Sequence, residues 1–63
     1  MAKEREFWSE DQQDYVRWAN ARQDGSEIDV TRDGKTWRGT VVSIRAGHDN
    51  GKLRYYITLR SND

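Results

Sequence analysis

The stretch DGKTWRGTVVSIR, residues 33–45, decides how this chain folds. It opens with Asp33-Gly34, a dipeptide favoured in two-residue hairpin turns because both residue types tolerate positive φ. A tryptophan, a glycine and several β-branched residues follow, which is typical of a β-strand. A second turn dipeptide, Asn50-Gly51, comes soon after it. The stretch is therefore predicted to lie in the middle strand of two consecutive hairpins.

The same turn signals predict the flanking strands. β-Branched residues recur in 26–32, and β-branched and aromatic residues in 52–60, on either side of a middle strand expected over 35–46. Strands joined by two-residue turns pair antiparallel. The three segments therefore predict a three-stranded antiparallel meander.

A helix is predicted ahead of the meander, over 9–23. The run Ser9-Glu10-Asp11-Gln12 matches a capping box, in which a serine hydroxyl accepts from a first-turn amide and a glutamine reaches back. Apolar residues follow at spacings of three and four, and Asp24-Gly25 provides a stop. The side expected to face the sheet carries Tyr15, Val16, Trp18, Ala19 and Arg22.

These elements predict an α+β fold in one small domain over 1–63, with the N-terminal amphipathic helix packed on the meander. Residues 1–6 are expected to form a flexible lead, and Phe7 with Trp8 to fold back as an anchoring pair. The chain has 63 residues and no cysteine, so neither a disulfide nor a thiolate zinc site can supplement its core. Trp8 and Trp18 are both expected to pack in that core.

The two hairpins disagree by one residue over which side of the middle strand faces the core. The second turn pairs Ile44 with Ile57 and Val42 with Leu59, which places even-numbered residues of this strand inward. The first turn, taken as a two-residue loop, places odd-numbered residues inward instead. One irregularity must absorb the difference.

A β-bulge at Arg38-Gly39 is the favoured solution, because it places Trp37 in the core and keeps the charge of Arg38 out of it. The alternative is a three-residue loop over 32–34 with Gly34 in the left-handed region. In that register Trp37 lies on the open face of the sheet and Arg38 lies under the helix.

Two short motifs lie in this region: Gly34-x-x-Trp37-x-Gly39-x-Val41-Val42 and Tyr55-Tyr56-x-Thr58-Leu59. They resemble the central strands of small SH3-like barrels of the Tudor and KOW kind, over about residues 33–59. The resemblance implies a curved small sheet used for binding, without catalytic chemistry. The meander has fewer strands than those barrels, and no residue here is assigned to a methyl-ligand cage.

Charge and hydropathy limit the classes of partner. The 11 Lys and Arg residues balance 11 Asp and Glu residues, so the chain lacks the overall basic charge of many nucleic-acid binders. Residues 25–63 hold seven basic and five acidic side chains, a mild bias toward anionic contacts. No run approaches the roughly 18 apolar residues of a membrane span, and no signal-peptide core is present. We expect a cytoplasmic protein without a membrane partner.

The sequence predicts no catalytic residue, no metal site and no cofactor. His48, the only histidine, has no cysteine or evident nucleophile to work with, so it is interpreted as a solvated turn residue. Glu10, Asp11 and Asp14 are explained by their place in the first turn of a helix, where acidic side chains are favoured. The chain is accordingly predicted not to be an enzyme.

The open face of the sheet is the candidate binding site, since one helix covers only one side. The residues expected there are Arg45, Arg54, Tyr56, Arg60 and Val41, with Trp37 added in the alternative register. Tyrosine and arginine are enriched at binding hot spots. A solvated face, on which Glu27 and Asp29 partly balance the arginines, is the competing interpretation.

The leading functional hypothesis is a non-enzymatic module that docks on a partner protein through this face. The size of the chain fits a small inhibitor or regulator. The alternative is nucleic-acid binding by the same face, with arginines on phosphates and Tyr56 or Trp37 stacked on unpaired bases. Self-association through the open face or an exposed edge is a third hypothesis.

Overall fold

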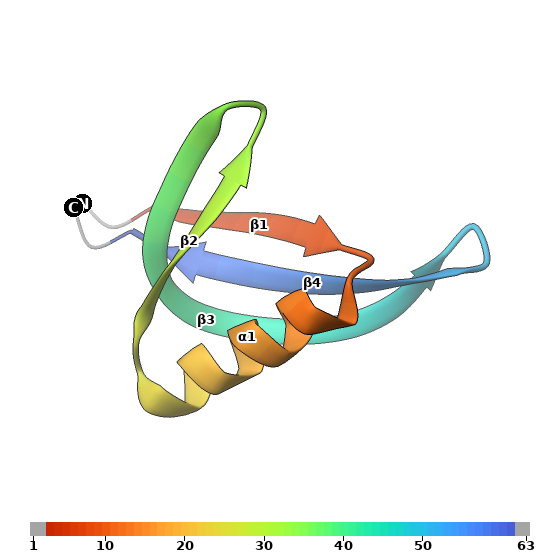
Figure 1. Ribbon diagram of the computed structural model, residues 1–63, viewed down its shortest axis with the longest axis horizontal. Helices are drawn as coiled ribbons and strands as arrows, with labels where there is room; N and C mark the ends of the chain where they lie inside the picture. The colour runs from red at the N-terminus through yellow and green to blue at the C-terminus, as the bar shows by residue number, and fades with distance from the viewer. Residues whose placement is uncertain (1–2, 62–63) are drawn as a thin grey trace.

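The computed structural model describes residues 3–61, which form one helix and four strands. The elements follow in the order β1 (Glu4–Ser9), α1 (Gln12–Asp24), β2 (Glu27–Arg32), β3 (Lys35–Asp49) and β4 (Lys52–Arg60). The strands make one antiparallel sheet in the order β1-β4-β3-β2, curled into a half-barrel (Figure 1). The predicted α+β class is confirmed. The predicted three-stranded sheet is wrong, and the helix follows a strand rather than leading the chain.

β1 is the additional strand, and it includes residues 4–6 of the predicted flexible lead. It pairs with β4, so that Glu4 lies opposite Arg60 and Phe7 opposite Ile57. Phe7 is buried while Trp8 is 47% exposed, because neighbouring residues of a strand point to opposite faces. The predicted Phe7–Trp8 anchoring pair is therefore wrong. Residues 1–2 of the predicted lead lie outside the described residues.

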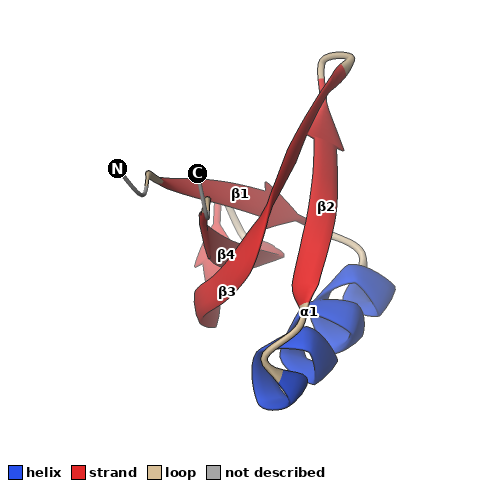
Figure 2. Cartoon of the chain, turned by 90° about the vertical axis from the view of Figure 1, so that its left-hand side faces the viewer, coloured by secondary structure: helices blue, strands red, loops and turns tan. Residues whose placement is uncertain are grey.

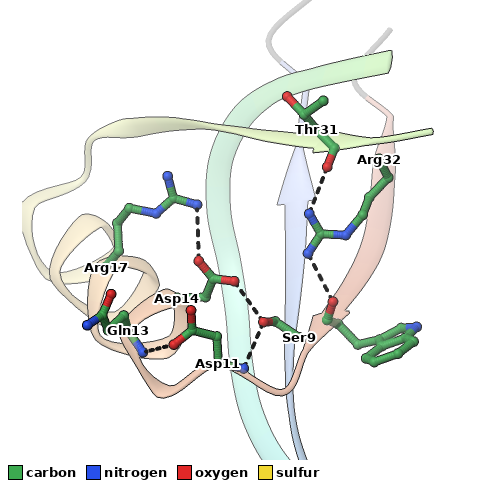
Figure 3. A network of polar contacts seen from close by, with 8 residues as sticks. Ser9, Asp11, Gln13, Asp14, Arg17, Thr31 and Arg32 are labelled. Carbon is green, nitrogen blue, oxygen red and sulfur yellow. Dashed lines mark hydrogen bonds and ion pairs between the residues drawn. The ribbon is translucent and has the colours of Figure 1, made fainter. Parts of the chain in front are cut away.

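The helix begins three residues later than predicted, because Asp11 and not Ser9 is its N-cap. The Asp11 carboxylate accepts from the Gln13 amide at 2.9 Å. Ser9 holds this turn from outside the helix, since its hydroxyl accepts from the Asp11 amide and donates to the Asp14 carboxylate at 2.7 Å (Figure 3). The predicted stop is confirmed: Gly25 caps the helix with φ of 71°, in the left-handed region.

The helix lies on the concave side of the sheet and fills one part of the half-barrel (Figure 2). Trp18 is fully buried and Ala21 nearly so. Tyr15 packs on Tyr55 of β4 with ring centroids 4.8 Å apart. Val16, predicted to face the sheet, is half exposed, because the buried stripe follows the spacing 15, 18 and 21.

Both predicted hairpin turns are confirmed as two-residue turns. Asp33 and Gly34 have φ of 54° and 75°, and Asn50 and Gly51 have φ of 53° and 77°. Two consecutive positive φ values are the conformation that Asp-Gly and Asn-Gly favour, and they fit the right-handed twist of paired strands. Val30 therefore pairs with Trp37, as the first turn predicts.

The register conflict within β3 is real, but the bulge lies at Val42 and not at Arg38-Gly39. Val41 pairs with Leu59 and Ser43 with Thr58, which leaves Val42 as the extra residue. Val41 is consequently 8% exposed and faces the core, whereas Val42 is 37% exposed. The predicted pairing of Val42 with Leu59 is wrong, and so is the prediction that Val41 lies on the open face.

The position of the bulge has a physical reason. The pairing of β2 with β3 runs without interruption as far as Glu27 opposite Thr40, and β2 begins there. A bulge at Gly39 would interrupt this ladder, whereas Val42 lies beyond it, so the bulge there disturbs only the pairing with β4, which runs from Thr40 to Asp49. Gly39 is needed for another reason, because a Cβ there would lie 2.8 Å from the Arg60 carbonyl carbon.

The curl of the sheet brings its two edge strands together at one point. Arg32 of β2 donates from Nη2 to the Trp8 carbonyl of β1 at 3.0 Å and from Nη1 to its neighbouring Thr31 carbonyl at 2.8 Å (Figure 3). Inside the curl, Trp37 of β3 lies 6.5 Å from Phe7 of β1, centroid to centroid. The buried core consists of Phe7, Trp18, Ala21, Val30, Val41, Ile57 and Leu59.

The bulge position predicts unequal effects on stability for two neighbouring valines. Val41→Thr buries a hydroxyl in place of a methyl group and should lower the free energy of unfolding by about 1–3 kcal/mol. Val42→Thr, at an exposed position, should change it by about 0.5 kcal/mol or less. Denaturant titration of both variants measures the difference. Equal effects, or a larger effect at Val42, would contradict the bulge at Val42.

The close approach at Gly39 predicts that Gly39→Ala destabilises the protein by about 1–3 kcal/mol, because the Arg60 backbone has to move. Gly47→Ala is the matched control, since a Cβ there meets only ordinary contacts at 3.7 Å to Arg45 and Tyr56. Thermal unfolding of the two variants compares them. A fully stable Gly39→Ala protein would show that the strands do not approach as described.

Candidate functional site

The convex side of the sheet carries two stacks of a guanidinium group on an aromatic ring. Trp8, Tyr56 and Arg45 lie opposite one another across β1, β4 and β3. The Arg45 guanidinium is 4.0 Å from the Tyr56 ring centroid, and that of Arg54 is 4.0 Å from the Trp8 ring centroid. We call Trp8, Arg45, Arg54 and Tyr56 the aromatic–arginine face.

Arg54 is the most constrained member of this face. Its Nη1 donates to the Asp49 carboxylate at 2.7 Å, and its side chain is only 23% exposed. Its Nε is buried and has no hydrogen-bond partner within residues 3–61. The contacts with Trp8 and Asp49 therefore fix the plane of this guanidinium, which reduces the entropy it would lose on binding a partner.

Each arginine along this side of the sheet has a carboxylate beside it. Arg45 lies 3.5 Å from Glu6, and Arg60 donates to Glu4 from Nη2 at 2.7 Å and from Nε at 3.1 Å. Glu4 and Glu6 come from β1, so the strand that the sequence analysis missed supplies the charges that balance the predicted arginine face.

The charge of Arg38 is also balanced, in this case by two carboxylates of β2. It donates to Glu27 at 3.2 Å and to Asp29 at 3.1 Å. The hydrogen bond with Glu27 and the nearby charge of Asp29 raise the pKa of the Arg38 guanidinium above its ordinary value. Glu27 and Asp29 are predicted to balance the arginines of the open face. In the structure both carboxylates pair with Arg38, which lies outside the core.

Four of the six predicted binding residues share the convex side. Arg45, Arg54 and Tyr56 come together in the aromatic–arginine face, and Arg60 lies further along β4. Val41 is buried in the core, because the bulge comes after it. Trp37 faces the concave side, as the favoured register predicts, and packs against the core while remaining partly exposed.

Trp8 is the member of the face that the sequence analysis placed in the core. The signal was present in residues 4–9, EREFWS, where a period of two separates Arg5 and Phe7 from Glu6 and Trp8. The capping-box signal that begins at Ser9 favours the interpretation of the preceding residues as a flexible N-terminal segment. Trp18 is buried as predicted, so only one of these two tryptophans belongs to the core.

The chain matches no protein-family model, no curated protein and no solved structure. The resemblance to SH3-like barrels therefore stays a prediction. Within residues 3–61, no group of three or more His, Cys, Asp or Glu side chains is arranged to hold a metal ion. No helix in the same part of the chain is long and apolar enough to cross a membrane.

The stack of Arg54 on Trp8 predicts a measurable coupling between these residues. A double-mutant cycle with Trp8→Leu and Arg54→Gln should give a coupling free energy of about 0.5–1 kcal/mol, the usual range for an exposed cation–π contact. Denaturant unfolding of the four proteins provides the measurement. A coupling of zero would mean that the two side chains do not stack in solution.

Proposed function

We propose that this protein is a non-enzymatic binding module that docks on a partner protein through the aromatic–arginine face. One observation carries the proposal: two guanidinium–aromatic stacks lie on neighbouring strands, on the side of the sheet opposite the helix. Tryptophan, tyrosine and arginine are the three residue types most enriched among interface hot spots. Here they occur together, on strands rather than on loops.

The rigidity of this face supports protein binding. A partner that packs on Trp8 removes apolar surface from water, and Trp8 is 47% exposed in the free protein. The stacked arginines offer donors to neutral carbonyl groups at the rim without first having to be ordered. Such a surface combines an apolar centre with oriented polar groups, which is the usual anatomy of an interface.

The charge balance disfavours nucleic acid as the ligand of this face. Arg38, Arg45, Arg54 and Arg60 each lie next to at least one carboxylate. A phosphate would have to displace those carboxylates and then meet their repulsion. Nucleic-acid binding draws much of its affinity from uncompensated cations that release counterions.

The SH3-like resemblance and the role of a small inhibitor or regulator belong to the same proposal. The curl of the sheet supports an SH3-like use of a small curved sheet as a binding scaffold. A partner-docking module of this size suits a small inhibitor or regulator. Self-association through the same face is the competing hypothesis that the experiment below has to exclude.

The proposal is tested by affinity capture with the purified protein as bait. A protein partner should be recovered with the native chain and lost with a Tyr56→Ala, Arg54→Glu variant, because both stacks are then broken. A Val16→Ala, Arg22→Glu variant is the matched control, since it changes an apolar and a basic side chain on the exposed side of α1. It should retain the partner.

Three results would overturn the proposal. Recovery of the same proteins by both double variants would place the binding surface elsewhere. Recovery of nucleic acid, in a manner that weakens steeply with salt, would favour the alternative ligand. Concentration-dependent dimers that Tyr56→Ala, Arg54→Glu abolishes would assign the face to self-association.

A further inference from the structure

The concave side of the sheet holds a cleft that the helix does not fill. Its volume is about 350 Å³, at the lower end of the range for ligand pockets. The cleft lies between β1 and the hairpin that joins β2 to β3, with Phe7 and Trp37 as its aromatic lining. Because Arg5 and Phe7 alternate with Glu6 and Trp8 along β1, this cleft opens on the side opposite the aromatic–arginine face.

The charges around the cleft are unbalanced, in contrast to those of the convex side. Among residues 3–61, Arg5, Arg32 and Lys35 line it together with a single carboxylate, that of Asp33. Neither Arg5 nor Lys35 has an ion pair with any carboxylate of residues 3–61. Arg32 gives its hydrogen bonds to the Thr31 and Trp8 carbonyls, which leave its charge uncompensated.

Arg5 is oriented by the aromatic lining. Its guanidinium carbon lies 5.1 Å from the Phe7 ring centroid and 5.8 Å from the Trp37 ring centroid. Two aromatic contacts restrain the group without using its N–H donors in ion pairs. A guanidinium held in this way is prepared for a planar, two-oxygen acceptor, since a carboxylate matches its forked donors.

We propose that this cleft binds a side-chain carboxylate of an acidic peptide segment, with Arg5 as its principal donor and Lys35 as a second cation. Charge complementarity carries the proposal, because the cleft has three cations and one carboxylate within a chain whose total charge is zero. The site is independent of the proposed function, since it shares no residue with the aromatic–arginine face.

The position of Arg5 favours an acidic peptide over single-stranded nucleic acid. A base would have to stack on the face of Phe7 or Trp37, and Arg5 already lies over both rings. Displacing Arg5 would lose its cation–π contacts with both rings. It would also move away a cation that the phosphates of the nucleic acid need. A carboxylate instead meets the N–H edge of the guanidinium and leaves both contacts in place.

The test is an NMR titration of the ¹⁵N-labelled full chain at low ionic strength with acetylated, amidated hexaglutamate. Saturable shifts should appear at the Arg5 Nε–H, the Lys35 amide and the Trp37 indole. Arg5→Gln should weaken binding by at least about tenfold, as expected when a hydrogen bond to a charged group is lost. The spectrum of each variant also reports whether it remains folded.

A comparison of two lysine variants distinguishes binding at the cleft from general electrostatic attraction to the protein. Lys35 and Lys52 each follow the glycine of a two-residue turn, but only Lys35 lines the cleft. Lys35→Gln should weaken hexaglutamate binding by about threefold or more, while Lys52→Gln should leave it unchanged. Equal losses at the two lysines, or no saturable shift at Arg5 and Trp37, would overturn the proposal.

Two further ligands decide its chemical class. Inorganic phosphate and a hexamer of deoxythymidylate are titrated under the same conditions. Both should bind more weakly than hexaglutamate, and neither should move the Trp37 indole resonance as far. Tighter binding of phosphate or of the oligonucleotide would overturn the assignment to an acidic peptide.

Discussion

The extra residue at Val42 is the constraint on which the rest of the structure depends. β3 pairs with β2 over residues 35–40 and with β4 over residues 40–49, and each hairpin turn sets its own inward-facing set of residues. The bulge reconciles the two sets, so that Trp37 and Val41 face the core before it and Ile44 faces the core after it. Without it, one of the two halves would turn its apolar side to water.

The same junction allows the sheet to curl. Gly39 leaves room for the Arg60 backbone, and bulges increase the local twist of a strand. β1 then pairs with the outer edge of β4, and Arg32 reaches from β2 to the Trp8 carbonyl of β1. The two binding surfaces proposed here both follow from this geometry, because curling creates a convex side for aromatic–guanidinium stacks and a concave side with a cleft.

The two surfaces differ in how their cations are used. On the convex side Arg45, Arg54 and Arg60 are paired with carboxylates, and the aromatic rings dominate. On the concave side Arg5 and Lys35 line the cleft without a carboxylate partner among residues 3–61, so charge dominates. A chain with equal numbers of acidic and basic residues can therefore hold two surfaces of different character. Net charge alone distinguishes neither of them.

The sequence by itself determined both two-residue turns, the glycine stop of the helix, the burial of Trp18 and the need for one irregularity in the middle strand. These features depend on local backbone preference and on the period of the apolar residues, which are readable within a few positions. Only the tertiary structure decided that residues 4–9 are a strand, that the bulge lies at Val42, and that Trp8 is exposed. Those outcomes depend on contacts between residues far apart in the sequence, such as Phe7 with Ile57 and Val41 with Leu59. β1 needs β4 as its partner, and the bulge lies beyond the stretch in which β3 pairs with β2.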